Sequence, residues 1–248
     1  MPFHITNWSR SLLEAALALL SPPVCFLCGE PTHRERRALC WECLRKNLLG
    51  AENVCGVCGI QMPGPGQTCG DCSHERPAFM KARAAVVFAG GARKLVHFFK
   101  YRKSLWLRGD FGEWLHGCFL AHYADAIFDC IVPVPVSRVK FFQRGYNQSE
   151  FLARDLGKKI SLPVLPRALA RRGNLFSATQ TTLSRSERAA NVARAFYVAQ
   201  PKLVEGRDIL LLDDVFTTGA TANACARALK KAGAESVRVI TVARGVMD

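Results

Sequence analysis

The sequence predicts an α/β fold with a largely parallel sheet, preceded by a small cysteine-rich module. The four aliphatic residues at 209–212 indicate a strand that is buried on both faces, as strands of parallel sheets are, and residues 129–135 indicate a second buried strand that ends in a loop containing proline. Eight of the 11 cysteines fall within residues 25–72, which predicts the separate module. With 248 residues the chain can form one large or two modest domains, and we expect the module at 1–80 and the α/β domain at 81–248.

The apolar strand at 209–212 leads into the most informative segment of the chain. Asp213 and Asp214 follow the strand, and a turn of Thr and Gly residues at 217–221 then leads into a predicted helix at 222–232. In open α/β sheets, ligands bind beyond the carboxyl ends of the strands. The turn and the helix N-terminus offer N–H groups, hydroxyls and a positive dipole end to a phosphate, and the carboxylates suit sugar hydroxyls or a hydrated Mg²⁺. The segment therefore predicts a phosphosugar site, the alternative being an ordinary strand, turn and helix.

The order of residues in this segment resembles a known family. An apolar strand, Asp-Asp, two residues, Thr-Thr-Gly, one residue and Thr is similar to the loop that binds phosphoribosyl pyrophosphate (PRPP) in type I phosphoribosyltransferases. The resemblance implies a Rossmann-like domain that binds PRPP, or a related phosphosugar, together with Mg²⁺. It implies that Asp213 and Asp214 bind the ribose 2′- and 3′-hydroxyls. It also implies that the 5′-phosphate is wrapped by Thr217, Thr218, Gly219, Ala220 and Thr221.

Four Cys-x-x-Cys pairs make up the cysteine-rich module. They are Cys25/Cys28, Cys40/Cys43, Cys55/Cys58 and Cys69/Cys72. Two thiolates three positions apart on a tight turn can both face one Zn²⁺, and a second pair completes the tetrahedron. Gly29 and Gly59, which follow the first and third pairs, suit a metal-binding turn that needs a positive φ. We expect a double zinc ribbon with about two structural zinc ions, one on the first two pairs and one on the last two. The spacing also allows a crossed pairing.

The competing interpretation of these cysteines is a disulfide framework. The apolar stretch at 7–20 is the only one that looks like a secretory signal, but Glu14 interrupts it and no convincing cleavage site follows. It is also too short to span a bilayer, so we expect a short amphipathic helix there and no transmembrane segment in the chain. Metal-binding thiolates imply a reducing compartment, which predicts a cytoplasmic protein.

The net charge of +14 is carried entirely by residues 81–248, whereas residues 1–80 are neutral by formal count. The positive electrostatic field of this part of the chain favours polyanions, including PRPP, nucleotides and nucleic acid. The stretch 93–108 interleaves basic and aromatic residues, a composition that suits single-stranded nucleic acid. The residues predicted to make these contacts are Lys100, Tyr101, Arg102, Lys103 and Trp106. The alternatives are that the aromatics face the core of an amphipathic helix, and that Lys100 reaches the phosphosugar site.

A basic segment follows the second predicted strand. Its order, Val-Pro-Val-Pro and later Arg-Gly-Tyr-Asn-Gln, is similar to that of the ComF/GntX-type proteins, which are phosphoribosyltransferase-like proteins associated with competence and DNA uptake. In type I enzymes the loop after an early strand binds the pyrophosphate, which implies this role for Arg138, Lys140 and Arg144. The polar stretch between Arg171 and Phe196 fits the same family and is a candidate flap over the site, with a solvated connecting loop as the alternative.

The resemblance implies a function in one of two classes. The first is a protein that binds PRPP with Mg²⁺ and single-stranded DNA and acts in DNA uptake during natural transformation, with a DNA-uptake helicase as a partner. The alternative is a catalytic phosphoribosyltransferase of nucleotide metabolism whose acceptor is unknown. Such an enzyme breaks the C1–pyrophosphate bond through an oxocarbenium-like state. Its catalytic groups would be Asp213, Asp214, Arg138 and Arg144.

Overall fold

The computed structural model describes residues 24–32, 39–40, 42–43, 45, 53–64, 66–102, 104–172 and 195–246. The chain divides into two compact units, Met1–Asn47 and Leu48–Asp248. The first four cysteines of the module lie in the smaller unit, and the last four lie in the larger unit with the sheet. The helix expected at 7–20, the residue Lys103 and most of the candidate flap (173–194) lie outside the described residues.

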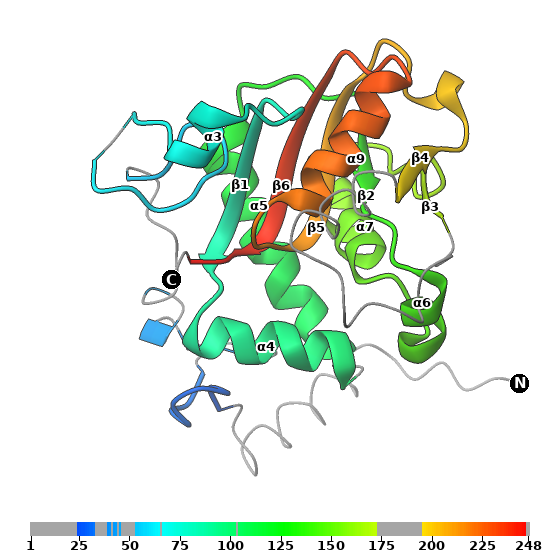
Figure 1. Cartoon of the computed structure of the whole chain (residues 1–248). Coiled ribbons are helices and arrows are strands. Elements are labelled where there is room, and N and C mark those ends of the chain that lie inside the picture. The colour runs from blue at the N-terminus through cyan, green and yellow to red at the C-terminus, as the bar shows by residue number, and fades with distance from the viewer. Residues whose placement is uncertain are drawn as a thin grey trace, which may run out of the picture. The chain divides into compact units, whose positions relative to one another are not determined.

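A parallel sheet forms the core of the larger unit (Figure 1). In the part of the chain that the structure describes it has four strands in the order β1-β6-β5-β2, which are β1 (Lys81–Val87), β2 (Cys130–Pro133), β5 (Asp208–Phe216) and β6 (Ser236–Arg244). β5 pairs in parallel with β2 on one side and with β6 on the other. This interior place explains its run of four aliphatic residues, all of which are fully buried. The predicted parallel sheet and both predicted strands are confirmed.

Helices cover both faces of this sheet, as an α/β fold requires. α5 (Arg108–Tyr123) and α7 (Gln148–Ile160) pack against each other and on the sheet, and α9 (Ala220–Lys231) packs on β5 and β6. Figure 1 shows α9 in front of the sheet and α5 behind it. The other elements are α3 (Gly70–His74), α4 (Gly90–Tyr101), α6 (Arg138–Arg144), the 3₁₀ helices η1 (Leu105–Leu107) and η2 (Pro201–Leu203), and the antiparallel strands β3 (Leu169–Arg171) and β4 (Phe196–Val198). Among all the described residues, no helix has both the length and the apolar character needed to cross a membrane.

Because the strands are parallel, their carboxyl ends lie at one edge of the sheet. α4 follows β1 at this edge, α6 follows β2, and the turn before α9 follows β5 (Figure 1). Ser137 caps the N-terminus of α6, because its hydroxyl accepts a hydrogen bond from the N–H of Lys140 (3.3 Å), and Gly145 caps the C-terminus with a φ of +83°. These caps turn the chain back into α7. Segments that are far apart in the sequence therefore meet at the carboxyl edge.

The turn that carries the last four cysteines is built onto the free edge of the sheet. The N–H of Ala82 in β1 donates to the carbonyl of Val57 (2.7 Å), and Arg83 donates to the carbonyls of Cys55 and Gly56 (3.2 Å each). An uncovered edge strand presents unpaired N–H and C=O groups, so these contacts also protect β1. The four cysteines belong to the same buried core as β5, β6 and α9. This half of the cysteine module is therefore part of the sheet's own packing.

Gly59 is the position where this packing is tightest. Its φ is +69°, and a Cβ there would lie 2.7 Å from the carbonyl oxygen of Ala82. Gly59→Ala combines left-handed strain with a backbone clash and should lower the free energy of unfolding by about 2–4 kcal/mol. Gly66→Ala is the matched control, because its φ is +71° but a Cβ there meets nothing within 4 Å, and it should cost only about 1 kcal/mol. Urea unfolding measures both losses, and equal losses would contradict the packing.

Candidate functional site

The predicted phosphate turn lies at the carboxyl edge of the sheet. β5 ends at Phe216, and α9 begins at Ala220 after a short turn. Gly219 precedes the helix with a φ of +81°, and a Cβ there would lie 2.5 Å from the Phe216 ring, so glycine is the residue that fits. Thr217 and Thr218 are exposed, and the N–H of Ala220 donates to Thr218 Oγ1 (3.4 Å). The residues predicted to wrap a phosphate thus share one solvent-facing turn at the N-terminus of a helix of 12 residues.

Asp213 and Asp214 are held by contacts from two other helices. Asp213 Oδ1 accepts hydrogen bonds from Ser149 Oγ in α7 (2.9 Å) and from the N–H of Asp214 (2.8 Å). Asp214 is only 8% exposed, and its Oδ1 lies 2.9 Å from Lys100 Nζ in α4. Burial and the negative charge of Asp214 raise the pKa of Asp213 to about 7, against the lowering effect of Lys100. Without a ligand, the Asp213 carboxyl is therefore partly protonated at neutral pH.

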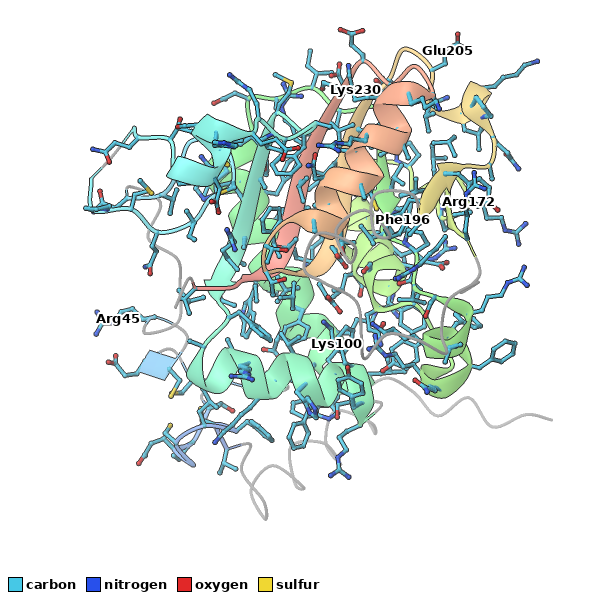
Figure 2. The ribbon with its side chains drawn as sticks, viewed as in Figure 1. Arg45, Lys100, Arg172, Phe196, Glu205 and Lys230 are labelled. Carbon is cyan, nitrogen blue, oxygen red and sulfur yellow. The ribbon has the colours of Figure 1, made fainter. Side chains whose placement is uncertain are left out.

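The ion pair with Asp214 brings Lys100 to this site. The sequence predicts Lys100 as a nucleic-acid contact and leaves the phosphosugar site as an alternative; the ion pair favours the alternative. Figure 2 shows the Lys100 side chain at the carboxyl edge, and that side chain is only 21% exposed. A buried carboxylate without a partner is costly, and the ion pair with Lys100 gives the buried Asp214 side chain that partner.

Two residues that the sequence offered only as part of the Arg-Gly-Tyr-Asn-Gln order fix α7 beside the carboxylates. Asn147 caps the helix, because its Oδ1 accepts from the N–H of Ser149 (3.1 Å) while its Nδ2 donates to the carbonyl of Val134 (3.1 Å). The hydroxyl of Tyr146 donates to the carbonyl of Phe99 (2.7 Å), which joins α4 to the same turn. An Asn directly before a helix is an N-cap signal that the sequence contains. Nothing in the sequence indicates that Ser149 reaches a carboxylate of β5.

The three predicted pyrophosphate contacts differ in exposure. Arg138 and Lys140 are exposed on α6, whereas Arg144 is buried at its end. Arg144 Nη1 donates to Gln148 Oε1 (3.1 Å), and its guanidinium carbon lies 4.9 Å from the centre of the Tyr101 ring. Arg144 Nε and Gln148 Nε2 are buried with no hydrogen-bond partner among the described residues. Arg138 and Lys140 are therefore open to a ligand, while Arg144 joins α6 to α4 and α7.

The residues predicted to contact nucleic acid are largely on the surface. Tyr101 and Trp106 are 57% and 55% exposed, and Arg102 is exposed as well. The alternative in which the aromatics face the core is wrong for these two rings, although Phe99 is fully buried. α6 adds an exposed aromatic that the sequence reasoning missed, Phe142, which is 83% exposed. Because the guanidinium of Arg144 in α6 stacks on the ring of Tyr101 in α4, the two helices are neighbours at this surface.

Each set of four cysteines gathers its sulfur atoms within 4.8 Å of one another. The sets are Cys25, Cys28, Cys40 and Cys43, here called the first cluster, and Cys55, Cys58, Cys69 and Cys72, here called the second cluster. Consecutive pairing is therefore confirmed, and the crossed alternative is wrong. The structure describes all 11 cysteines of the chain, and none of them forms a disulfide, so the disulfide alternative is also wrong.

The chemistry of both clusters fits zinc. Gly29 and Gly59, which follow the first pair of each cluster, adopt positive φ angles of +76° and +69°, as a metal-binding turn requires. In the second cluster the N–H groups of Cys58 and Cys69 donate to Cys55 Sγ (3.5 and 3.4 Å). Burial raises the pKa of the Cys55 thiol, but these backbone donors outweigh it and lower the pKa to about 6. Four sulfurs that include a thiolate at neutral pH match the ligand set of structural zinc, so both clusters are Cys₄ zinc-binding sites.

Comparisons with known proteins agree with this geometry. Residues 16–73 match the family model of a double zinc ribbon domain, and residues 144–246 match that of a phosphoribosyl transferase domain. Competence protein F of Haemophilus influenzae is 29% identical over 89% of this chain and 96% of its own length. The DNA utilization protein YhgH of Escherichia coli is 28% identical over 91% of this chain and 99% of its own. Competence protein ComFC of Bacillus subtilis is 26% identical over 96% of this chain and 92% of its own.

The matched models fall on the two parts of the chain that carry the chemistry. The zinc ribbon model spans both cysteine clusters, and the transferase model contains the carboxylates, the phosphate turn and α9. The relatives align over most of the chain and not over one domain only. The chain is therefore a homologue of competence protein F, ComFC and YhgH that joins a double zinc ribbon to a phosphoribosyl transferase domain.

Proposed function

We propose that the chain binds PRPP, or a related phosphosugar, together with Mg²⁺ at the carboxyl edge of the sheet. The observation that carries this proposal is the exposed Thr/Gly turn at the N-terminus of α9 directly beside Asp213 and Asp214. The N–H groups and hydroxyls of the turn would bind the 5′-phosphate. The two carboxylates would accept hydrogen bonds from the ribose 2′- and 3′-hydroxyls.

Positive charge for the pyrophosphate comes from two helices at this edge. Arg138 and Lys140 are exposed on α6, and Lys100 of α4 lies against the carboxylates. Mg²⁺ would add charge neutralisation between phosphate oxygens. A ligand that brings Mg²⁺ or hydroxyl donors to Asp213 favours its ionised form. Because the pKa of this carboxyl is raised to about 7, binding at neutral pH would release a fraction of a proton.

A second candidate function is transfer of the phosphoribosyl group to an acceptor. The match to a phosphoribosyl transferase domain favours it. Asp213 and Asp214 would hold the ribose while the bond from C1 to pyrophosphate breaks, and Arg138 with Lys140 would stabilise the departing pyrophosphate. PRPP loss and pyrophosphate release in the presence of nucleobases or DNA would distinguish turnover from binding alone.

We further propose that the chain binds single-stranded DNA and serves DNA uptake in the cytoplasm during natural transformation, with a DNA-uptake helicase as a partner. The names of the relatives, which refer to competence and DNA utilization, support this role. Residues 81–248 carry the whole net charge of +14. Tyr101, Arg102 and Trp106 add exposed stacking and phosphate-binding groups. In this proposal the ribbon part, residues 1–80, has a role separate from polyanion binding.

The phosphosugar assignment is tested by removing both carboxylates. Asp213→Ala combined with Asp214→Ala should weaken PRPP binding by about 2–4 kcal/mol, because the charged acceptors of the ribose hydroxyls are lost. Titration calorimetry with and without Mg²⁺ measures the effect. The control variant is Asp125→Ala combined with Glu205→Ala, which removes two carboxylates from exposed positions. Glu205 lies at the opposite end of the sheet from Lys100 (Figure 2). Unchanged binding by the first variant, or equal weakening by both, would refute the assignment.

The zinc assignment predicts a stoichiometry. Freshly purified, reduced protein should contain about two zinc ions per chain, since each cluster supplies a complete tetrahedral set of sulfurs. Chelation should expose reactive thiols, because the free energy of binding structural zinc is also free energy of folding. Metal analysis and thiol titration measure these two quantities. A content well below one zinc per chain would contradict the assignment, and a content near one would restrict it to a single cluster.

The DNA proposal predicts different effects of charge and stacking. Arg102→Ala should weaken single-strand binding and flatten the slope of log K against log salt by about 0.7, because one phosphate contact is lost. Trp106→Ala should weaken binding by about 1–3 kcal/mol with little change in that slope. Lys231→Ala, an exposed charge at the far end of α9, is the control. If this control flattens the slope as much as Arg102→Ala does, the contact surface is not the one proposed.

A further inference from the structure

One buried arginine, Arg244, contacts backbone carbonyls of the phosphate turn from its buried side. Arg244 is the last residue of β6 and is 7% exposed. Its Nη1 donates to the carbonyls of Phe216 (3.2 Å), Thr217 and Gly245 (3.1 Å). Its guanidinium carbon also lies 4.6 Å from the centre of the Phe216 ring. The path of the chain out of β5 and into the turn therefore depends on where this guanidinium sits.

The same guanidinium reaches the second cysteine cluster. Arg244 Nε donates to the carbonyl of Cys58 (3.2 Å), and Nη2 lies 3.8 Å from Cys58 Sγ. Four thiolates around one Zn²⁺ leave excess negative charge, which a neighbouring guanidinium offsets. One planar, forked cation thus contacts a zinc ligand on one side and the phosphate turn on the other.

Two further contacts join the second cluster to the turn and its helix. The chain runs from Cys72 in α3 to β1 through residues 75–80, and in this segment the ring of Phe79 meets that of Phe216 edge to face (5.8 Å, 83°). The N–H of Ala78 donates to Asn223 Oδ1 in the first turns of α9 (2.8 Å). The Phe216 ring is therefore fixed between Phe79 and the guanidinium, and Gly219 packs directly on it.

We propose that the second cluster, when it holds zinc, keeps the phosphate turn in its binding conformation, with Arg244 as the positioning residue. Zinc fixes both Cys58 groups that Arg244 contacts. When the metal is lost, the cysteine turn can open, and the buried guanidinium must find new acceptors because leaving its donors unpaired is costly. The Thr217 carbonyl then loses the Arg244 donor, and the Phe216 carbonyl keeps only the N–H of Gly245. Zinc occupancy at the second cluster thereby controls the fraction of molecules that present a binding-competent turn.

This inference rests on the proposed function only for the identity of the ligand, PRPP. The effect of zinc on the conformation of the turn is a property of the ligand-free protein, and it can be measured without PRPP. The N–H of Asn223 donates to the carbonyl of Gly219 (2.8 Å), and the N–H of Gly245 donates to the carbonyl of Phe216 (2.8 Å). Both hydrogen bonds close the turn, so the exchange rates of these two amides report its order without any ligand.

The experiment compares full-length, zinc-loaded protein with two cysteine variants. Cys58→Ser combined with Cys72→Ser should lose about one zinc per chain and speed hydrogen exchange of the two turn amides about tenfold, with a similar loss of PRPP affinity. Cys28→Ser combined with Cys43→Ser removes two ligands of the first cluster, which belongs to the other compact unit. This variant should also lose about one zinc per chain, but the exchange rates of the turn amides and the PRPP affinity should stay unchanged.

Arg244→Lys tests the link without touching a cysteine. A lysine keeps the charge but cannot bridge Cys58, Phe216 and Gly245 at once, because its ammonium is a single point. The variant should keep its full zinc content while the turn amides exchange faster and PRPP affinity falls. Arg238→Lys, in the same strand but paired with Asp208, is the matched control and should leave all three quantities unchanged. The amide of Val134, bonded to the carbonyl of Leu212 inside the sheet, reports that the core stays folded.

Two results would overturn the inference. One is equal exchange of the turn amides in the variants of the first and second clusters. The other is wild-type exchange of those amides in Arg244→Lys. If wild-type protein does not bind PRPP, the proposed function fails, and the exchange rates of the ligand-free variants still decide whether zinc orders the turn.

Discussion

The parallel pairing of β5 with β2 and β6 is the constraint on which the rest of the structure depends. Together with the parallel pairing of β1 and β6, it brings the carboxyl ends of the four described strands of this sheet to one edge, so that each strand delivers a different part of the site. Lys100 arrives after β1, Ser149 after β2, Asp214 on β5 and Arg244 at the end of β6. The Thr/Gly turn alone would be an ordinary helix start. Lys100 and Ser149 fix the carboxylates beside the turn, and Arg244 fixes the backbone carbonyls on its buried side.

Three buried charged groups of the site have protein partners in the absence of a ligand. Asp214 pairs with Lys100, Asp213 accepts from Ser149, and Arg244 donates to the carbonyls under the turn. A buried charge without such a partner would be costly. Because these contacts already set the geometry, a phosphosugar would exchange partners with a preformed site instead of ordering a loose one, which lowers the cost of binding. Through Arg244, which also donates to the carbonyl of Cys58, these contacts connect the turn to the second cysteine cluster.

Local sequence patterns predicted the elements, and long-range contacts account for what those patterns could not show. The aliphatic run of β5, the turn after it and the four Cys-x-x-Cys pairs are recognisable because neighbours in the sequence define them. The partners of Lys100 and Ser149 depend on which strands are adjacent, and no local pattern specifies that. Arg244 looks like any arginine at the end of an apolar strand. Cysteine spacing favoured consecutive pairs but also allowed crossed ones, and it did not show that the second cluster packs on β1.

The central claim, that the carboxyl edge of the sheet is the phosphosugar site, is tested most directly by following backbone amide resonances during a titration with PRPP and Mg²⁺. The account predicts saturable shifts at Thr217, Thr218 and Ala220 and at Ser149, with Asp208 and Ser236 at the amino edge unmoved. Shifts centred on the amino edge, or no saturable shift at the turn, would contradict it.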